Sequence, residues 1–329
     1  MRRVIWTSAR VAAAIALLYF ALSRAGNLSA LKQLFASPWM LLVLALPALG
    51  GAAIEALRMR VLFRSQNLDV PFPYGYQVAA VASFFSLCLP GGTSGDVMKL
   101  YYLSSYTKGR RVEIATVLLT DRVLAMFVLL TVVVSLAFFE HSLIAQSKVI
   151  LSLVTTASAL MVGLAAFALI STSKRIRATR IYVAVLKRMP FSQYLARISD
   201  ALLAFRDHGD AVLKAAGFSL VGHMLLASMF AAVGSVVLPQ APAATVVTLS
   251  LLGMFGNALP ITPGGLGVGE SAFQGLFGLA GFAGGAALVL AWRIGMIFLC
   301  GIGCLIYIAG PQGQPREFNQ PLPVPEVSQ

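Results

Sequence analysis

Long uncharged apolar runs recur along the chain and restrict what it can fold into. Several of them reach the roughly 20 residues that an α-helix needs to cross about 30 Å of hydrocarbon. They lie at 11–23, 39–54, 114–120, 123–139, 149–172 and 215–240. Only 11% of the residues are charged, against about 25% in an ordinary soluble chain. These features predict an all-α polytopic membrane protein and exclude a soluble one.

Six of the apolar segments are long enough for full membrane spans. We expect these spans near 4–23, 38–57, 112–139, 149–172, 212–238 and 285–309. They form one membrane domain over 1–310, and the Pro- and Gln-rich tail at 311–329 is expected to be disordered. Arg2 and Arg3 before the first apolar stretch also fit a signal peptide, but Arg24 lies where small cleavage-site residues are needed. A retained first span is therefore favoured.

The two remaining apolar segments, 74–105 and 243–280, are each interrupted by a Pro-Gly-Gly turn that is followed by an acid. Proline and adjacent glycines break a helix. We therefore predict two broken re-entrant hairpins, which give about eight membrane segments in all. The turn residues are Pro90, Gly91 and Gly92 in the first segment and Pro263, Gly264 and Gly265 in the second, and the acids are Asp96 and Glu270.

The distribution of basic residues favours hairpins that return to the side on which they enter, either as re-entrant segments or as paired full crossings. If each enters and leaves on one side, the basic loops and the basic stretch Lys174 to Lys214 fall on the cytoplasmic side, as the positive-inside rule requires. Both termini are then cytoplasmic. The loops in question carry Arg58, Arg60, Arg64, Lys99, Lys108, Arg110 and Arg111.

The order of elements predicts an inverted repeat with halves at about 1–145 and 146–310. Each half contains two spans, a broken hairpin and a third span, and the order of turn, acid and intramembrane arginine occurs twice. Two such turns could arise by chance in a chain with 29 Gly and 15 Pro, but the shared order favours a repeat. Inverted repeats place the ligand site of many transporters near the midplane. The connector at about 174–210 fits amphipathic helices on the membrane surface or a solvated loop.

Arg122 and Arg293 lie inside predicted spans and are the main candidates for a binding site. An intramembrane charge costs roughly 2.5 to 3.5 kcal/mol on insertion scales, and a guanidinium is a planar donor suited to phosphate. The alternative is structural: Arg122 pairs with Asp96 or Asp121, and Arg293 with Glu270. The predicted substrate-binding set is Arg122, Arg293, Asp96, Glu270, Asp121 and Asn257. Glu55 and Glu113 are expected at the membrane interface.

No catalytic, metal or cofactor site is predicted. The twelve acidic residues form no DxD or DDxxD pattern, and no Gly-x-Ser-x-Gly motif is present. The three cysteines lie in apolar segments without a CxxC pair. Cytoplasmic loops facing anionic lipid explain the net charge of +13 without nucleic acid.

The two motif regions resemble the transmembrane region of lysylphosphatidylglycerol synthases. The segment from Leu89 to Asp96, the Thr120-Asp121-Arg122 sequence and the segment from Pro260 to Glu270 carry the resemblance, which covers about 5–310. Stand-alone bacterial and archaeal relatives, some hopanoid-associated, share this region. The resemblance implies a lipid flippase in the bacterial inner membrane, without the separate soluble domain that performs aminoacyl transfer.

We therefore expect a translocator of a polar lipid, such as an aminoacylated or isoprenoid-linked one, and not an enzyme. Its expected partners are membrane phospholipids or polyprenyl and hopanoid lipids, and the sequence leaves open a lipid-modifying enzyme and a homo-oligomer. The alternative is a membrane enzyme, or its accessory subunit, that acts on a phospho- or isoprenoid lipid.

Overall fold

The computed structural model describes residues 38–88, 94–107, 110–141, 143, 147–179, 182, 188, 192–257 and 268–310. These residues form helices and connections, without a strand among them. The helices are α3 (Pro38–Ser65), α4 (Phe72–Cys88), α5 (Ser94–Tyr106), α6 (Arg111–Phe139), α8 (Lys148–Thr172), α9 (Lys174–Arg177), α11 (Ser192–Ala204), α12 (Gly209–Val237), α13 (Ala243–Asn257), α14 (Val268–Leu279) and α15 (Gly285–Ala309).

Five helices are long and apolar enough to cross a membrane: α3, α6, α8, α12 and α15. They confirm a polytopic all-α membrane protein and match five of the six predicted spans. The sixth, at 4–23, lies outside the described residues. The turn residues Pro90, Gly91, Gly92, Pro263, Gly264 and Gly265 and the tail at 311–329 also lie outside them.

One predicted boundary is wrong. Arg58, Arg60 and Arg64 were expected in a loop after residue 57, but α3 continues to Ser65 and contains all three. Arginine is a good helix former, and the last two turns of α3 bury the apolar side chains of Met59 and Phe63. The helix therefore ends where this buried face ends and not at the first charge.

Two pairs of shorter helices occupy the segments predicted as broken hairpins. In the first, α4 packs against α5, and in the second, α13 packs against α14. At 12 to 17 residues each, these helices are about 18 to 26 Å long. That length falls short of the hydrocarbon core, as a broken segment requires. Their entry and exit on one side of the membrane stays a prediction.

The helix contacts follow a two-fold pattern. Helix α3 packs on α12, α15 packs on α3, α4 and α14, and α6 packs on α12, α13 and α5. Exchanging α3 with α12, α4 with α13, α5 with α14 and α6 with α15 maps this set of contacts onto itself. Two related halves would produce that pattern, while their inversion across the membrane stays a prediction.

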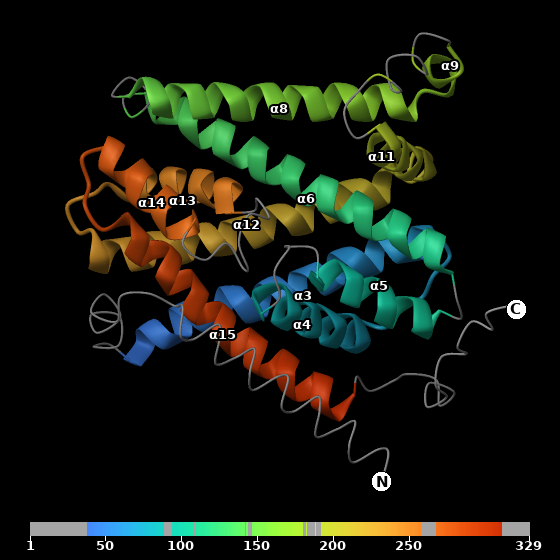
Figure 1. Ribbon diagram of the computed structural model, residues 1–329, viewed down its shortest axis with the longest axis horizontal. Coiled ribbons are helices and arrows are strands. Elements are labelled where there is room, and N and C mark those ends of the chain that lie inside the picture. Colours follow the sequence, from blue (N-terminus) through green and yellow to red (C-terminus); the bar gives the residue numbers. More distant parts are fainter. Residues whose placement is uncertain are drawn as a thin grey trace, which may run out of the picture.

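Helix α15 lies close to α3 and α4, on the side opposite α8 (Figure 1). Two of its glycines allow this approach. A Cβ at Gly295 would overlap the carbonyl oxygen of Leu44, and a Cβ at Gly303 would overlap that of Ala80. Small residues serve this purpose in membrane helices, since packing and not the hydrophobic effect holds such helices together.

The connector between the halves contains α9 and α11. Helix α11 packs on α6 and α8 and buries Ile198 and Ala201, while Arg197 is exposed. Arg177 at the end of α9 forms an ion pair with Asp200 of α11, and its Nη1 donates to the Ser199 carbonyl oxygen at 3.2 Å. The connector is thus an amphipathic element attached to the membrane helices.

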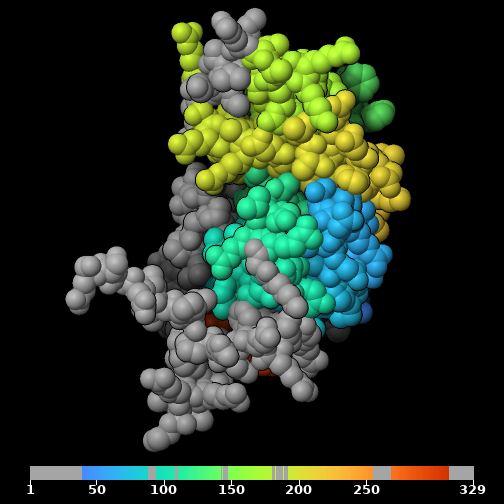
Figure 2. Space-filling view, turned by 90° about the vertical axis from the view of Figure 1, so that its right-hand side faces the viewer, coloured from blue at the N-terminus to red at the C-terminus, as the bar shows by residue number. Residues whose placement is uncertain are grey.

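Most exposed cations of the described residues gather at one end of the helices. This end comprises the C-terminal ends of α3 and α8, the N-terminal ends of α6 and α12, and the connector (Figure 1). Figure 2 views it, with the connector in yellow-green above α5 and the end of α3. We call it the connector end. Its exposed cations are Arg64, Arg110, Arg111, Lys174, Arg175, Arg188, Arg197, Arg206 and Lys214.

Candidate functional site

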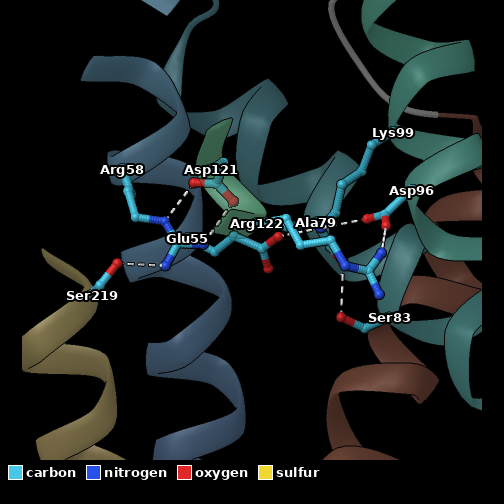
Figure 3. Close-up of polar contacts among 9 residues, drawn as sticks. All are labelled: Glu55, Arg58, Ala79, Ser83, Asp96, Lys99, Asp121, Arg122 and Ser219. Carbon is cyan, nitrogen blue, oxygen red and sulfur yellow. Dashed lines mark hydrogen bonds and ion pairs between the residues drawn. The ribbon is translucent and has the colours of Figure 1, made fainter. Parts of the chain in front are cut away.

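Six charged side chains from three helices form one cluster, which we call the charge cluster (Figure 3). It contains three carboxylates and three cations, so its formal charge is zero when all six are ionised. Its members are Glu55 and Arg58 of α3, Asp96 and Lys99 of α5, and Asp121 and Arg122 of α6.

The most enclosed pair joins Arg58 to Asp121. Arg58 Nε lies 2.5 Å from Asp121 Oδ1 and Nη2 lies 2.7 Å from Oδ2, so the guanidinium holds both carboxylate oxygens. Nη1 donates to the Ser219 hydroxyl of α12 at 2.8 Å. The two charged side chains are 11% and 8% exposed. This geometry links the first half to the second.

The sequence did not predict these partners. Asp121 was considered as a partner of Arg122, but it binds Arg58, and neither Arg58 nor Ser219 was a candidate. One signal was available: Glu55 and Arg58 lie three residues apart in an otherwise apolar stretch, and that spacing places both on one helix face.

Lys99 forms the second pair with Glu55, and its Nζ also lies 3.8 Å from Asp96 Oδ1. The Lys99 and Glu55 side chains are 15% and 23% exposed. One prediction is corrected here, because Lys99 was expected in a loop but lies in α5. Helices α3 and α5 pack on common neighbours and bring the side chains of Lys99 and Glu55 together. The location of Glu55 at the membrane interface stays a prediction.

Arg122 and Asp96 form the third pair, as one of the two predicted pairings required. It is the most open of the three, because Arg122 is 47% exposed and Asp96 39%. Asp96 lies in the first turn of α5, which is anchored to α4. The Ser94 hydroxyl donates to the Phe85 carbonyl oxygen at 3.0 Å, and a Cβ at Gly95 would lie 2.6 Å from the Ala82 carbonyl oxygen.

The second half contains the corresponding pair. Arg293 Nε of α15 lies 2.9 Å from Glu270 Oε1 of α14, which confirms the predicted pairing, and Nη2 donates to Oε2 at 3.3 Å. Glu270, like Asp96, occupies the first turn of its helix. The burial differs, however, since Arg293 is only 3% exposed and Glu270 19%.

Asn257 is the last residue of α13, and its side chain lies outside what the structure describes. Within the described residues, no group of three His, Cys, Asp or Glu side chains could hold a metal ion. Each carboxylate of the charge cluster has a cation partner, so the cluster is arranged as ion pairs. A ligand that enters it would exchange with one of these partners.

Comparison of the chain with models of known protein families gives a match. The family model described as the lysylphosphatidylglycerol synthase TM region matches residues 7–303. No curated protein and no solved structure gives a significant match.

Proposed function

Since the chain belongs to the lysylphosphatidylglycerol synthase TM-region family, we propose that it is a flippase that moves a polar lipid across the bacterial inner membrane. The observation that carries this proposal is the open Arg122–Asp96 pair in an otherwise enclosed, neutral charge cluster. The ligand class is a lipid with a phosphate in its headgroup, either a phospholipid or a polyprenyl or hopanoid lipid carrying phosphate.

Arg122 is the cation best placed to bind the headgroup. Arg58 and Lys99 are enclosed by their carboxylate partners, whereas almost half of the Arg122 side chain is accessible. A guanidinium can hold phosphate through two parallel hydrogen bonds. When a phosphate replaces Asp96 at Arg122, Asp96 still has Lys99 as a neighbour, so the exchange leaves no carboxylate without a cation.

Arg293 acts as a positioning residue in this proposal. Its buried pair with Glu270 fixes the first turn of α14 against α15, at the place where the first half has its open pair. An arginine that is 3% exposed cannot meet a headgroup without a rearrangement. We therefore assign phosphate binding to Arg122 and support of the second hairpin to Arg293.

The basic connector end supports a cytoplasmic location for the connector, the side on which both termini are predicted, since cytoplasmic loops carry the excess of Lys and Arg. In the described residues, Lys148 is the exposed cation at the opposite end. Anionic lipids of the cytoplasmic leaflet would be attracted to such a surface. A headgroup would then reach the charge cluster from the cytoplasmic side.

A reconstitution assay tests this function. Purified protein is inserted into vesicles that contain fluorescent phosphatidylglycerol, and dithionite bleaching reports the fraction of probe that has changed leaflets. We expect the wild type to accelerate movement, Arg122→Ala to abolish it, and Arg122→Lys, which lacks the planar fork, to retain part of it.

Arg64→Ala is the matched control, because Arg64 lies in an exposed pair with Asp69 at the connector end. It should leave movement unchanged. Lipid mass and composition are measured in the same vesicles. Chemical conversion of the lipid would favour the membrane-enzyme alternative, and a wild type without accelerated movement would refute the flippase.

A further inference from the structure

A groove of about 730 Å³ lies between α6, α8, α11 and α12, and none of the six residues of the charge cluster lines it. Helices α6 and α8 meet at one end and diverge toward the connector end, where α11 lies between them (Figure 1). Apolar side chains of all four helices make up most of the wall. The polar wall residues include Arg206, Ser173 and Thr120.

The groove has the depth of a single leaflet. Its wall covers Leu164 to Thr172 of α8 and Gly209 to Ala216 of α12, which is about 10 to 12 Å along each helix. Half of the hydrocarbon core is about 15 Å. A groove of this length can hold chains of one leaflet only.

Two polar groups in the wall point to a ligand with a polar head. The Thr120 hydroxyl is buried, belongs to a residue that is 3% exposed, and has no hydrogen-bond partner among the described residues. Arg206 is exposed, and its guanidinium forms no ion pair within the described part of the chain. A buried hydroxyl without a partner is destabilising, so a ligand that accepts a hydrogen bond there is favoured.

The groove is next to the charge cluster along two helices. Thr120 of α6 precedes Asp121, and Ala216 of α12 lies one turn before Ser219, which accepts the hydrogen bond from Arg58. Groove and cluster therefore share the walls formed by α6 and α12.

We propose that this groove binds one anionic phospholipid from the leaflet at the connector end. An acyl chain lies along α6, α8 and α12, the phosphate binds Arg206, and an ester carbonyl accepts a hydrogen bond from Thr120. Thr120 is the α6 wall residue nearest to the connector end, so the polar part of the lipid lies on that side of the groove. The inference that this lipid goes on from the groove to the charge cluster rests on the proposed function, whereas its binding in the groove does not.

Headgroup chemistry decides which lipid the groove prefers. Apolar chains gain little by moving from the bilayer into an apolar groove, because both environments are equally dry. Phosphate contacts with Arg206, in a surface that already carries an excess of cations, favour a net negative headgroup over a zwitterionic one. Phosphatidylglycerol should therefore bind better than phosphatidylcholine.

Photolabelling in vesicles tests the site in the unmodified protein. Vesicles of phosphatidylcholine receive a trace of phosphatidylglycerol or phosphatidylcholine that carries a diazirine in the acyl chain. After irradiation, mass spectrometry locates the adducts. We expect adducts on the groove-facing residues of α6, α8 and α12, and a higher yield with phosphatidylglycerol.

Two variants on α8 form a matched pair. Ala165 lines the groove, whereas the adjacent Ala166 is exposed outside it. Ala165→Trp should abolish groove labelling, and Ala166→Trp should leave it unchanged. Arg206→Gln should lower the phosphatidylglycerol yield about tenfold toward the phosphatidylcholine level, since it removes a charge-assisted hydrogen bond.

Equal yields of the two lipids in the wild type, adducts outside the groove, or equal labelling of the two tryptophan variants would overturn the proposal. Labelling and translocation are measured on the same vesicles, so the two proposals fail separately. Groove labelling without translocation refutes the flippase and keeps the lipid site. Normal translocation by Ala165→Trp with lost labelling keeps the flippase and refutes entry through the groove.

Discussion

Separating Arg58 from Asp121 should destabilise the fold more than any change at a surface ion pair. The pair is bidentate, at 2.5 and 2.7 Å, and both side chains are about nine-tenths buried. Replacing Arg58 by Met removes the charge and retains much of the apolar stem. Asp121 is then left as an uncompensated buried carboxylate, and Ser219 loses its donor.

Removing one partner of a buried ion pair typically lowers the free energy of unfolding by about 3 to 5 kcal/mol, whereas replacing both by apolar groups is often nearly neutral. We therefore expect Arg58→Met and Asp121→Leu each to be strongly destabilising. The double variant should regain most of the loss. The coupling free energy from this cycle should be about 2 kcal/mol or more.

Unfolding in mixed micelles with increasing SDS gives these free energies for the purified protein. The control is Arg64→Ala in the same helix, where the ion pair with Asp69 is 57% and 74% exposed at 3.4 Å. Exposed pairs contribute about 0 to 1 kcal/mol. If Arg58→Met is no more destabilising than Arg64→Ala, or if the two single losses simply add, the buried pair does not hold α3 to α6.

Three further predictions follow from the packing. Arg293→Ala should lower stability, and adding Glu270→Gln should restore folding because it removes the unpaired carboxylate; no recovery in the same unfolding assay would contradict a structural pair. Gly95→Ala should destabilise the protein by about 1 to 3 kcal/mol through overpacking, while Gly163→Ala, where no atom lies within 4 Å of the added Cβ, should not. In a chain without other cysteines, Gln193→Cys should react with an impermeant maleimide only in inverted vesicles; reaction from outside intact cells would refute a cytoplasmic connector.

The membrane class and the order of the segments were predictable because they depend on local properties. Apolar length identifies a span without knowledge of its neighbours. Pro-Gly-Gly interruptions likewise separate α4 from α5 and α13 from α14. Helix ends were less predictable, since α3 extends eight residues past its expected end at residue 57. A charge signals the end of a span only when it is not neutralised within the protein.

The charge cluster was predictable only in part. Asp96 and Arg122 were recognised because the order of Pro-Gly-Gly turn, acid and arginine occurs a second time, with Glu270 and Arg293. Arg58 was missed because its partners lie 63 and 161 residues away, in α6 and α12, and only tertiary packing brings them together. The different burial of Arg122 and Arg293 could not be predicted either, since both arginines have similar apolar neighbours in the sequence.

The charge balance of the cluster limits which residue can take part in the proposed transport. Six unpaired charges placed in hydrocarbon would cost about 15 to 20 kcal/mol on insertion scales, more than the 5 to roughly 15 kcal/mol by which proteins are usually stable. Pairing is therefore obligatory, and a cation can bind a ligand only if its carboxylate has a second partner. Asp96 meets this condition through Lys99, and its first partner, Arg122, is also the most exposed cation of the cluster. Arg58 is different, because releasing Asp121 would leave a carboxylate that is 8% exposed. The cluster can thus bind an anion if the anion replaces Asp96 at Arg122 while Arg58 keeps its pair with Asp121. The Arg58–Asp121 pair then still holds α3, α6 and α12 together.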